Sequence, residues 1–145
     1  MIREVTREEA GRVAELFRQL WPDKGIEAKH VGSIIESYRE EPGYWIFGYE
    51  DGGTLCGLIT VSFRLTFFQD GEVATIEDLV VDEACRGQGI GTALVEFAED
   101  KVVVDGRAGG IEAISDLYRE AAHGFWEKCG YSRLAFQFRK EIPQE

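Results

Sequence analysis

The sequence contains few of the residues that stabilise small secreted or metal-binding proteins. Its 145 residues include three cysteines, two histidines and three prolines. The cysteines Cys56, Cys85 and Cys129 form no CxxC pair and cannot all pair within one molecule, which suits a reducing cytoplasm. Because the two histidines have no partner at ligand spacing, the sequence predicts no metal site.

Long apolar runs are also missing. The longest are only a few residues, far short of a bilayer span, and no basic segment followed by an apolar segment opens the chain. We therefore expect a cytoplasmic protein without membrane contact. Apolar residues make up 44% and charged residues 30%, as in an ordinary globular protein. A chain of this length suits one compact domain, and we expect a single domain over residues 1–145.

Basic residues are outnumbered by acidic ones. There are 16 Lys and Arg against 27 Asp and Glu, which gives a formal net charge of −11. This charge repels phosphate backbones, so a nucleic acid is a poor candidate partner. It attracts cations and favours a cationic small-molecule substrate, although solubility alone also accounts for it.

The apolar periodicity changes several times along the chain and predicts a mixed α/β order. The expected elements are a strand at 1–5, helices over 13–21 and 31–38, strands at 44–49, 59–67 and 73–81, a helix from 90, a strand at 111–115, a helix over 117–129 and a strand at 134–138. Residues 6–9 form a capping box before the first helix. A strand–helix–strand unit over 73–115 implies a parallel pair joined by a right-handed crossover.

A glycine-rich loop, Arg86-Gly87-Gln88-Gly89-Ile90-Gly91, lies between a buried strand and the start of a helix. Its glycines let the backbone turn tightly and approach a ligand, and the free N–H groups of the helix face an anion. The dinucleotide pattern GxGxxG would need glycine in place of Thr92, and a nucleoside-triphosphate loop would need Gly-Lys-Ser/Thr. The loop therefore predicts a phosphate cradle of another kind.

The pattern R/Q-x-x-G-x-G/A in this loop resembles that of the GNAT superfamily of acyl-CoA-dependent N-acyltransferases. The segments Ile76–Val81 and Ala122–Tyr131 carry further resemblance, and the order of elements matches that fold over nearly the whole chain. The resemblance implies an α/β (α+β) fold with a mixed central sheet of about six to seven strands and helices on both faces. It also implies transfer of the acetyl group of acetyl-CoA to a primary amine by direct attack through a tetrahedral intermediate.

The resemblance further implies that acetyl-CoA lies in a V between the strand ending at Val81 and the strand at 111–115. The strand backbone would pair with the pantetheine arm, the Val81 N–H would polarise the thioester carbonyl, and the loop amides would hold the pyrophosphate. Trp126 either stacks along the pantetheine or completes the core. The expected cofactor-binding residues are Leu79, Val80, Val81, Arg86, Gly87, Gln88, Gly89, Ile90, Gly91, Thr92, Ala122, Phe125 and Trp126.

Aminolysis of a thioester needs a base, because an amine with a pKa near that of lysine is mostly protonated at pH 7. Glu77, Asp78 and Glu112 are the candidates, since they lie on the two strands that would flank the thioester. Strand alternation predicts that Glu77 and Asp78 point to opposite faces of the sheet. We favour Glu77, whose apolar neighbours would exclude water.

A proton for the departing thiolate has no obvious source. Relatives often carry a tyrosine where this chain has Trp126, and an indole N–H only donates hydrogen bonds. Either Tyr118, Tyr131 or a water molecule supplies the proton, or the thiolate leaves unassisted.

Acceptor specificity in the family usually lies on the two N-terminal helices and the hairpin at 67–70. Trp21, Tyr38 and Phe68 form the expected aromatic wall, with counter-ions drawn from Glu27, Glu36, Glu40 and Asp70. Residues 20–23 look like a stretch of aminoglycoside N-acetyltransferases, whereas 122–126 and 136–140 are similar to aminoalkylphosphonate N-acetyltransferases.

The acidic charge makes a small amino sugar or polyamine-like amine the favoured acceptor. A protein or peptide amine acetyltransferase and a non-catalytic acyl-CoA-binding sensor are the alternatives. We also expect a homodimer, because residues 134–138 and the aromatic strands offer more apolar surface than one small core needs.

Overall fold

The computed structural model describes residues 1–69, 71–117 and 119–144. The predicted residues Asp70 and Tyr118 therefore lie outside the described residues. The chain forms two compact units, Met1–Ile114 and Ser115–Glu145. The first unit holds β1 (Ile2–Glu4), α1 (Ala10–Leu20), α2 (Ala28–Glu40), β2 (Tyr44–Asp51), β3 (Thr54–Thr66), β4 (Gly71–Val81), α3 (Ile90–Asp105) and β5 (Ala108–Ala113), and the second holds α4 (Glu120–Lys128).

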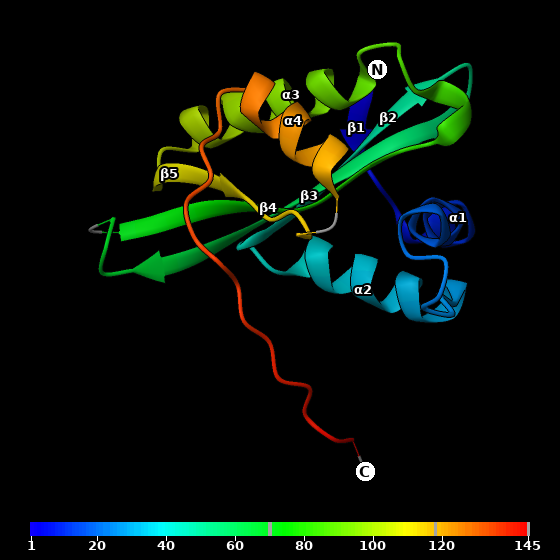
Figure 1. Cartoon of the computed structure of the whole chain (residues 1–145). Coiled ribbons are helices and arrows are strands. Elements are labelled where there is room, and N and C mark those ends of the chain that lie inside the picture. The colour runs from blue at the N-terminus through cyan, green and yellow to red at the C-terminus, as the bar shows by residue number, and fades with distance from the viewer. Residues whose placement is uncertain (70, 118, 145) are drawn as a thin grey trace. The chain divides into compact units, whose positions relative to one another are not determined.

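The sheet of the first unit confirms the mixed α/β class. Its order is β1-β2-β3-β4-β5, with antiparallel neighbours except for the parallel pair β4–β5. Figure 1 shows α1 and α2 on one face of this sheet and α3 on the other. Because α3 joins β4 to β5, the strand–helix–strand unit is present as expected. The helices thus cover both faces, and the loop after β4 opens directly onto α3.

Short-range patterns explain where the first helices lie. The Glu9 carboxylate accepts the Thr6 backbone N–H (3.1 Å) in the predicted capping box, and it also receives Arg3 in an ion pair of 2.8 Å. The apolar stripes of α1 and α2 then face the sheet, where Leu16 and Ile35 are almost fully buried. These contacts position the inner face of α1 over β3 and β4, and that of α2 over β2.

The expected number of strands is wrong, because the described residues form a sheet of five. Large apolar residues stand at every second position of 134–138, yet these residues lie in an irregular segment, and Phe138 is 92% exposed. Alternation only specifies which face a strand would bury. A strand also needs the N–H and C=O groups of a neighbour, and no described strand pairs with this segment.

Candidate active site

β4 extends well beyond its parallel neighbour β5. The parallel register ends where Ile76 faces Ala113, while β4 continues to Val81. The Asp82 N–H donates to the Cys56 carbonyl (2.8 Å). In an antiparallel pair every second residue directs its N–H and C=O groups to the neighbouring strand, so Asp82, Val80 and Asp78 direct theirs to β3. The N–H and C=O groups of Leu79 and Val81 therefore point away from β3. They face an edge that no described strand covers, as the expected V between β4 and β5 requires.

The loop after β4 has the backbone of an anion cradle. Gly87 and Gly89 have φ angles of +80° and +79°, in the left-handed region that favours glycine. A Cβ at either position would have no neighbour within 4 Å. The first internal bond of α3 runs from the Ala93 N–H to the Gly89 carbonyl (3.0 Å), so the preceding N–H groups have no partner within the helix. A pyrophosphate fits this exposed, glycine-lined helix start.

Helix α1 holds the start of this loop through two residues that sequence reasoning missed, Arg12 and Gln19. The Arg12 guanidinium pairs with Asp82, and this contact is the main reason why the pKa of Asp82 lies below its usual range. Gln19 accepts the Glu83 N–H (3.0 Å), and the Asp82 carboxylate also accepts the Ala84 N–H (2.9 Å). No sequence signal connects residues some 60 to 70 positions apart, because only the fold brings them together.

A β-bulge brings two carboxylates to one face of the sheet. Thr60 faces Asp78 across the ladder but Val61 faces Ile76, so Glu77 is the extra residue in β4. The Thr60 hydroxyl donates to Asp78 (2.7 Å), and the Ser62 hydroxyl donates to Glu77 (2.8 Å). Because Thr60 and Ser62 are two positions apart on β3, they share a face. The expectation that Glu77 and Asp78 point to opposite faces is therefore wrong, because it assumed regular alternation.

Asp78 lies in the lining of a cavity of about 570 Å³ between α1, α2 and the sheet. Burial raises the pKa of Asp78, and the nearby Glu77 carboxylate acts in the same direction. Tyr38 lines the same cavity, and burial together with the charge of Asp78 raises its pKa to about 12. The predicted Trp21 is also part of the lining, stacked on Phe17 with ring centroids 5.2 Å apart.

Other predicted acceptor residues lie elsewhere. Phe68 is 86% exposed and, like Glu36 and Glu40, is not part of the cavity lining, whereas Glu27 is. The third carboxylate candidate, Glu112 on β5, pairs with Arg64 (2.6 Å) and does not line the cavity either. Of the residues predicted for acceptor or base, the cavity lining thus gathers Trp21, Glu27, Tyr38 and Asp78, with Glu77 beside Asp78.

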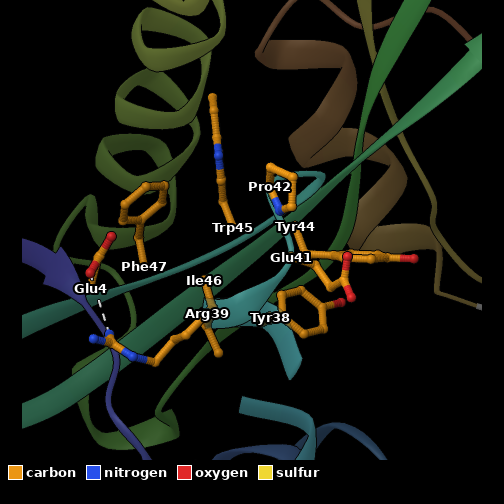
Figure 2. A pocket seen from close by; sticks show the side chains of 9 residues that line it. All are labelled: Glu4, Tyr38, Arg39, Glu41, Pro42, Tyr44, Trp45, Ile46 and Phe47. Atoms are coloured by element: carbon orange, nitrogen blue, oxygen red, sulfur yellow. Dashed lines mark hydrogen bonds and ion pairs between the residues drawn. The ribbon is translucent and has the colours of Figure 1, made fainter. Parts of the chain in front are cut away.

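A smaller cavity of about 230 Å³ shares Tyr38 and Ile46 with the first (Figure 2). Its charged lining includes the Arg39–Glu4 ion pair (3.3 Å), drawn as a dashed line in Figure 2. Its two carboxylates, Glu4 and Glu41, are exposed, so the smaller cavity presents no buried carboxylate comparable to Asp78.

The second unit carries the remaining cofactor-binding candidates on one helix. Ala122, Phe125 and Trp126 lie on α4, and Trp126 is buried. Its ring meets those of Phe125 and Tyr131 edge-on, each with centroids 5.2 Å apart. Tyr131, one of the candidate proton donors, therefore packs against the tryptophan that replaces the usual tyrosine.

Comparisons with known proteins agree with this geometry. Residues 11–131 match the Acetyltransferase (GNAT) family. A protein from Bacillus subtilis named "Uncharacterized N-acetyltransferase YhdJ" is 31% identical over 112 residues, which span 74% of this chain and 75% of that protein. A glucosamine 6-phosphate N-acetyltransferase from Arabidopsis thaliana is 31% identical over 107 residues, 73% of this chain and 69% of that protein.

The fold is shared with solved structures as well. A transcriptional regulator from Bacillus halodurans superposes with a TM-score of 0.89 at 20% identity, covering 98% of this chain and 99% of that protein. The chain belongs to the GNAT family of acetyltransferases. It is therefore an acyltransferase, of a family that generally uses acetyl-CoA. Among the described residues, no helix is long and apolar enough to cross a membrane.

Proposed function

We propose that this protein transfers the acetyl group of acetyl-CoA to the primary amine of a small molecule. The observation that carries the proposal is the position of Asp78. Its carboxylate lines a cavity large enough for a small molecule and lies immediately before Leu79–Val81, where no described strand pairs with the outer edge of β4. The cavity for the acceptor would therefore lie next to the edge of β4 along which we place acetyl-CoA.

Acetyl-CoA supplies an acyl thioester to this point. The N–H groups at the start of α3 would bind the pyrophosphate, and the glycines leave room for it. The outward-facing N–H and C=O groups of Leu79 would pair with the pantetheine arm, and the Val81 N–H would donate to the thioester carbonyl. The Val81 carbonyl already accepts the Arg86 side chain (3.2 Å), which holds the loop against the strand.

Asp78, rather than the expected Glu77, is the base that we propose. It takes a proton from the acceptor amine inside the cavity, and its raised pKa makes it a stronger base than an ordinary carboxylate. Thr60 holds the carboxylate in place by donating to it. Glu77 is held by Ser62 outside the cavity lining, and Glu112 is paired with Arg64. Tyr131, Tyr118 or water remain the proposed donors to the thiolate.

The proposal is tested by measuring thiol release from acetyl-CoA with a panel of primary amines, beside a calorimetric titration with CoA. We expect CoA to bind and at least one amine to cause thiol release. Failure to bind CoA would contradict the cradle at residues 86–92. Binding of CoA without release by any amine would favour the alternative of an acyl-CoA sensor.

We further propose that the protein forms a homodimer through residues 134–138. Leu134, Phe136 and Phe138 are each at least 73% exposed, and a second copy can bury them. The double substitution Phe136→Ser with Phe138→Ser should convert a dimer to a monomer, as measured by light scattering after gel filtration. A wild-type chain that is monomeric at all concentrations would contradict the proposal.

We place the protein in the cytoplasm, since three cysteines without a CxxC pair suit a reducing compartment. The net charge of −11 argues against nucleic acid as a partner.

A further inference from the structure

We infer that the acceptor is a primary amine carried on an apolar, ring-bearing body, such as an arylalkylamine, and not an amino sugar or a phosphorylated amine. This inference rests on the proposed function and narrows the acceptor class suggested by net charge. Two features of the cavity lined by Asp78 support the inference: its walls are mostly apolar, and its polar groups differ in how deeply they are buried.

The walls of this cavity are apolar and partly aromatic. Helix α1 contributes Phe17, and the residue that follows the helix is Trp21; their rings are stacked 5.2 Å apart and nearly parallel, with 4° between their planes. Helix α2 contributes Val31, Ile34 and Ile35. With a volume of about 570 Å³, the cavity accommodates a body the size of one or two rings. Flat rings and branched aliphatic chains favour an apolar, planar occupant.

The polar side chains that line the cavity differ in how deeply they are buried. Thr60 is 3% exposed, and Asp78 and Tyr38 are half-buried, whereas Lys24 and His30 are exposed. The Thr60 hydroxyl already donates to Asp78. The inner part of the cavity therefore offers one carboxylate and one phenol. This set satisfies a single amine, and leaves the rest of the ligand among apolar side chains.

The same lining residues disfavour other classes of acceptor. An amino sugar would bury several hydroxyl groups without partners against Ile35 and Ile46. A phosphorylated amine would need a cation beside its phosphate, but the lining cation Lys24 is exposed and shares its loop with Glu27. A polyamine carries further ammonium groups, for which the lining offers only the exposed carboxylate of Glu27, so part of its charged chain would lie against apolar side chains. A monoamine on an apolar body meets none of these penalties.

The first experiment compares primary amines as acceptors with the full chain and acetyl-CoA. We expect kcat/KM for 2-phenylethylamine to exceed that for glucosamine, glucosamine 6-phosphate, 2-aminoethylphosphonate and spermidine by about 100-fold, the effect of burying a six-carbon ring. An equal or higher kcat/KM for any of those four amines would overturn the inference.

A matched pair of variants tests whether this preference arises in the cavity. Ile34 is 43% exposed, so Ile34→Asn should fold normally while adding a polar group to the apolar wall. We expect the KM for 2-phenylethylamine to rise about tenfold with kcat little changed. The control is Val104→Asn, at another exposed branched residue of a helix that does not line the cavity. Equal effects of the two substitutions would contradict the assignment.

Direct binding separates failure of this inference from failure of the proposed function. Calorimetry of 2-phenylethylamine and glucosamine against the chain reports acceptor preference without any turnover. If 2-phenylethylamine bound more tightly but no amine caused thiol release, the inferred acceptor class would be supported and the proposed acetyl transfer would be contradicted. If only sugar or phosphorylated amines caused thiol release, the proposed acetyl transfer would be supported and the inferred acceptor class would be contradicted.

Discussion

Asp78→Asn should lower kcat for amine acetylation by about 10²- to 10⁴-fold, the range for loss of a positioned general base. The amide has the size of the carboxylate and its oxygen still accepts the Thr60 hydroxyl, but it cannot take a proton from the acceptor. The affinity for CoA should change little, because Asp78 lies in the acceptor cavity. Steady-state thiol release and calorimetric titration with CoA measure the two quantities.

The matched control is Glu77→Gln, the same chemical change at the next residue. Glu77 hydrogen-bonds Ser62 and is not part of the cavity lining, so we expect a loss of roughly tenfold or less. If Glu77→Gln abolished activity while Asp78→Asn preserved it, the base would be Glu77, and the assignment of Asp78 would be wrong.

A second readout of Asp78→Asn is the pH dependence of stability. The pKa of Asp78 is raised in the folded state, so the carboxyl group favours folding only while it is protonated. This contribution is complete below the unfolded pKa of about 3.9, and is lost as pH rises through the higher folded pKa. The melting temperatures of wild type and Asp78→Asn should therefore converge near pH 3. At pH 7 the variant should melt higher, and a lower melting temperature there would contradict the burial of the charge.

Gly89→Val should raise the Kd for CoA by roughly 100-fold. Gly89 has a φ of +79° at the start of α3, where a β-branched residue is strained. Its side chain would also project into open space above the helix N–H groups, where we place the pyrophosphate. Both effects act on the cradle, and calorimetry with CoA measures their sum.

Gly53→Val separates backbone strain from loss of the cradle. Gly53 has a φ of +80° and open space around its Cβ position, but it lies in the turn between β2 and β3. We expect this variant to melt at a lower temperature, as Gly89→Val does, while its Kd for CoA stays within about twofold of wild type. Equal losses of CoA affinity in both variants would mean that general destabilisation, and not the cradle, caused the effect.

Local patterns were sufficient for much of this protein. The capping box at Thr6 and Glu9, the apolar stripes of α1 and α2, and the glycine-rich loop between β4 and α3 depend on residues close together in the chain. Their spacing alone determines the backbone they form, because helix caps and tight turns are satisfied within a few residues. The class of fold and the expected position of the phosphate cradle therefore followed from the sequence.

Only the tertiary structure places Asp78, and not Glu77 or Glu112, in the lining of the larger cavity. The bulge at Glu77 depends on how β4 pairs with β3, and it turns Glu77 and Asp78 to one face. The cavity depends on how α1 and α2 pack over that face, and the Arg12–Asp82 pair joins residues 70 positions apart. The segment 134–138 shows the same limit, because alternation without a partner strand does not make a strand. Strand register and helix packing depend on many contacts between residues that are far apart in the sequence, so spacing along the chain does not specify them.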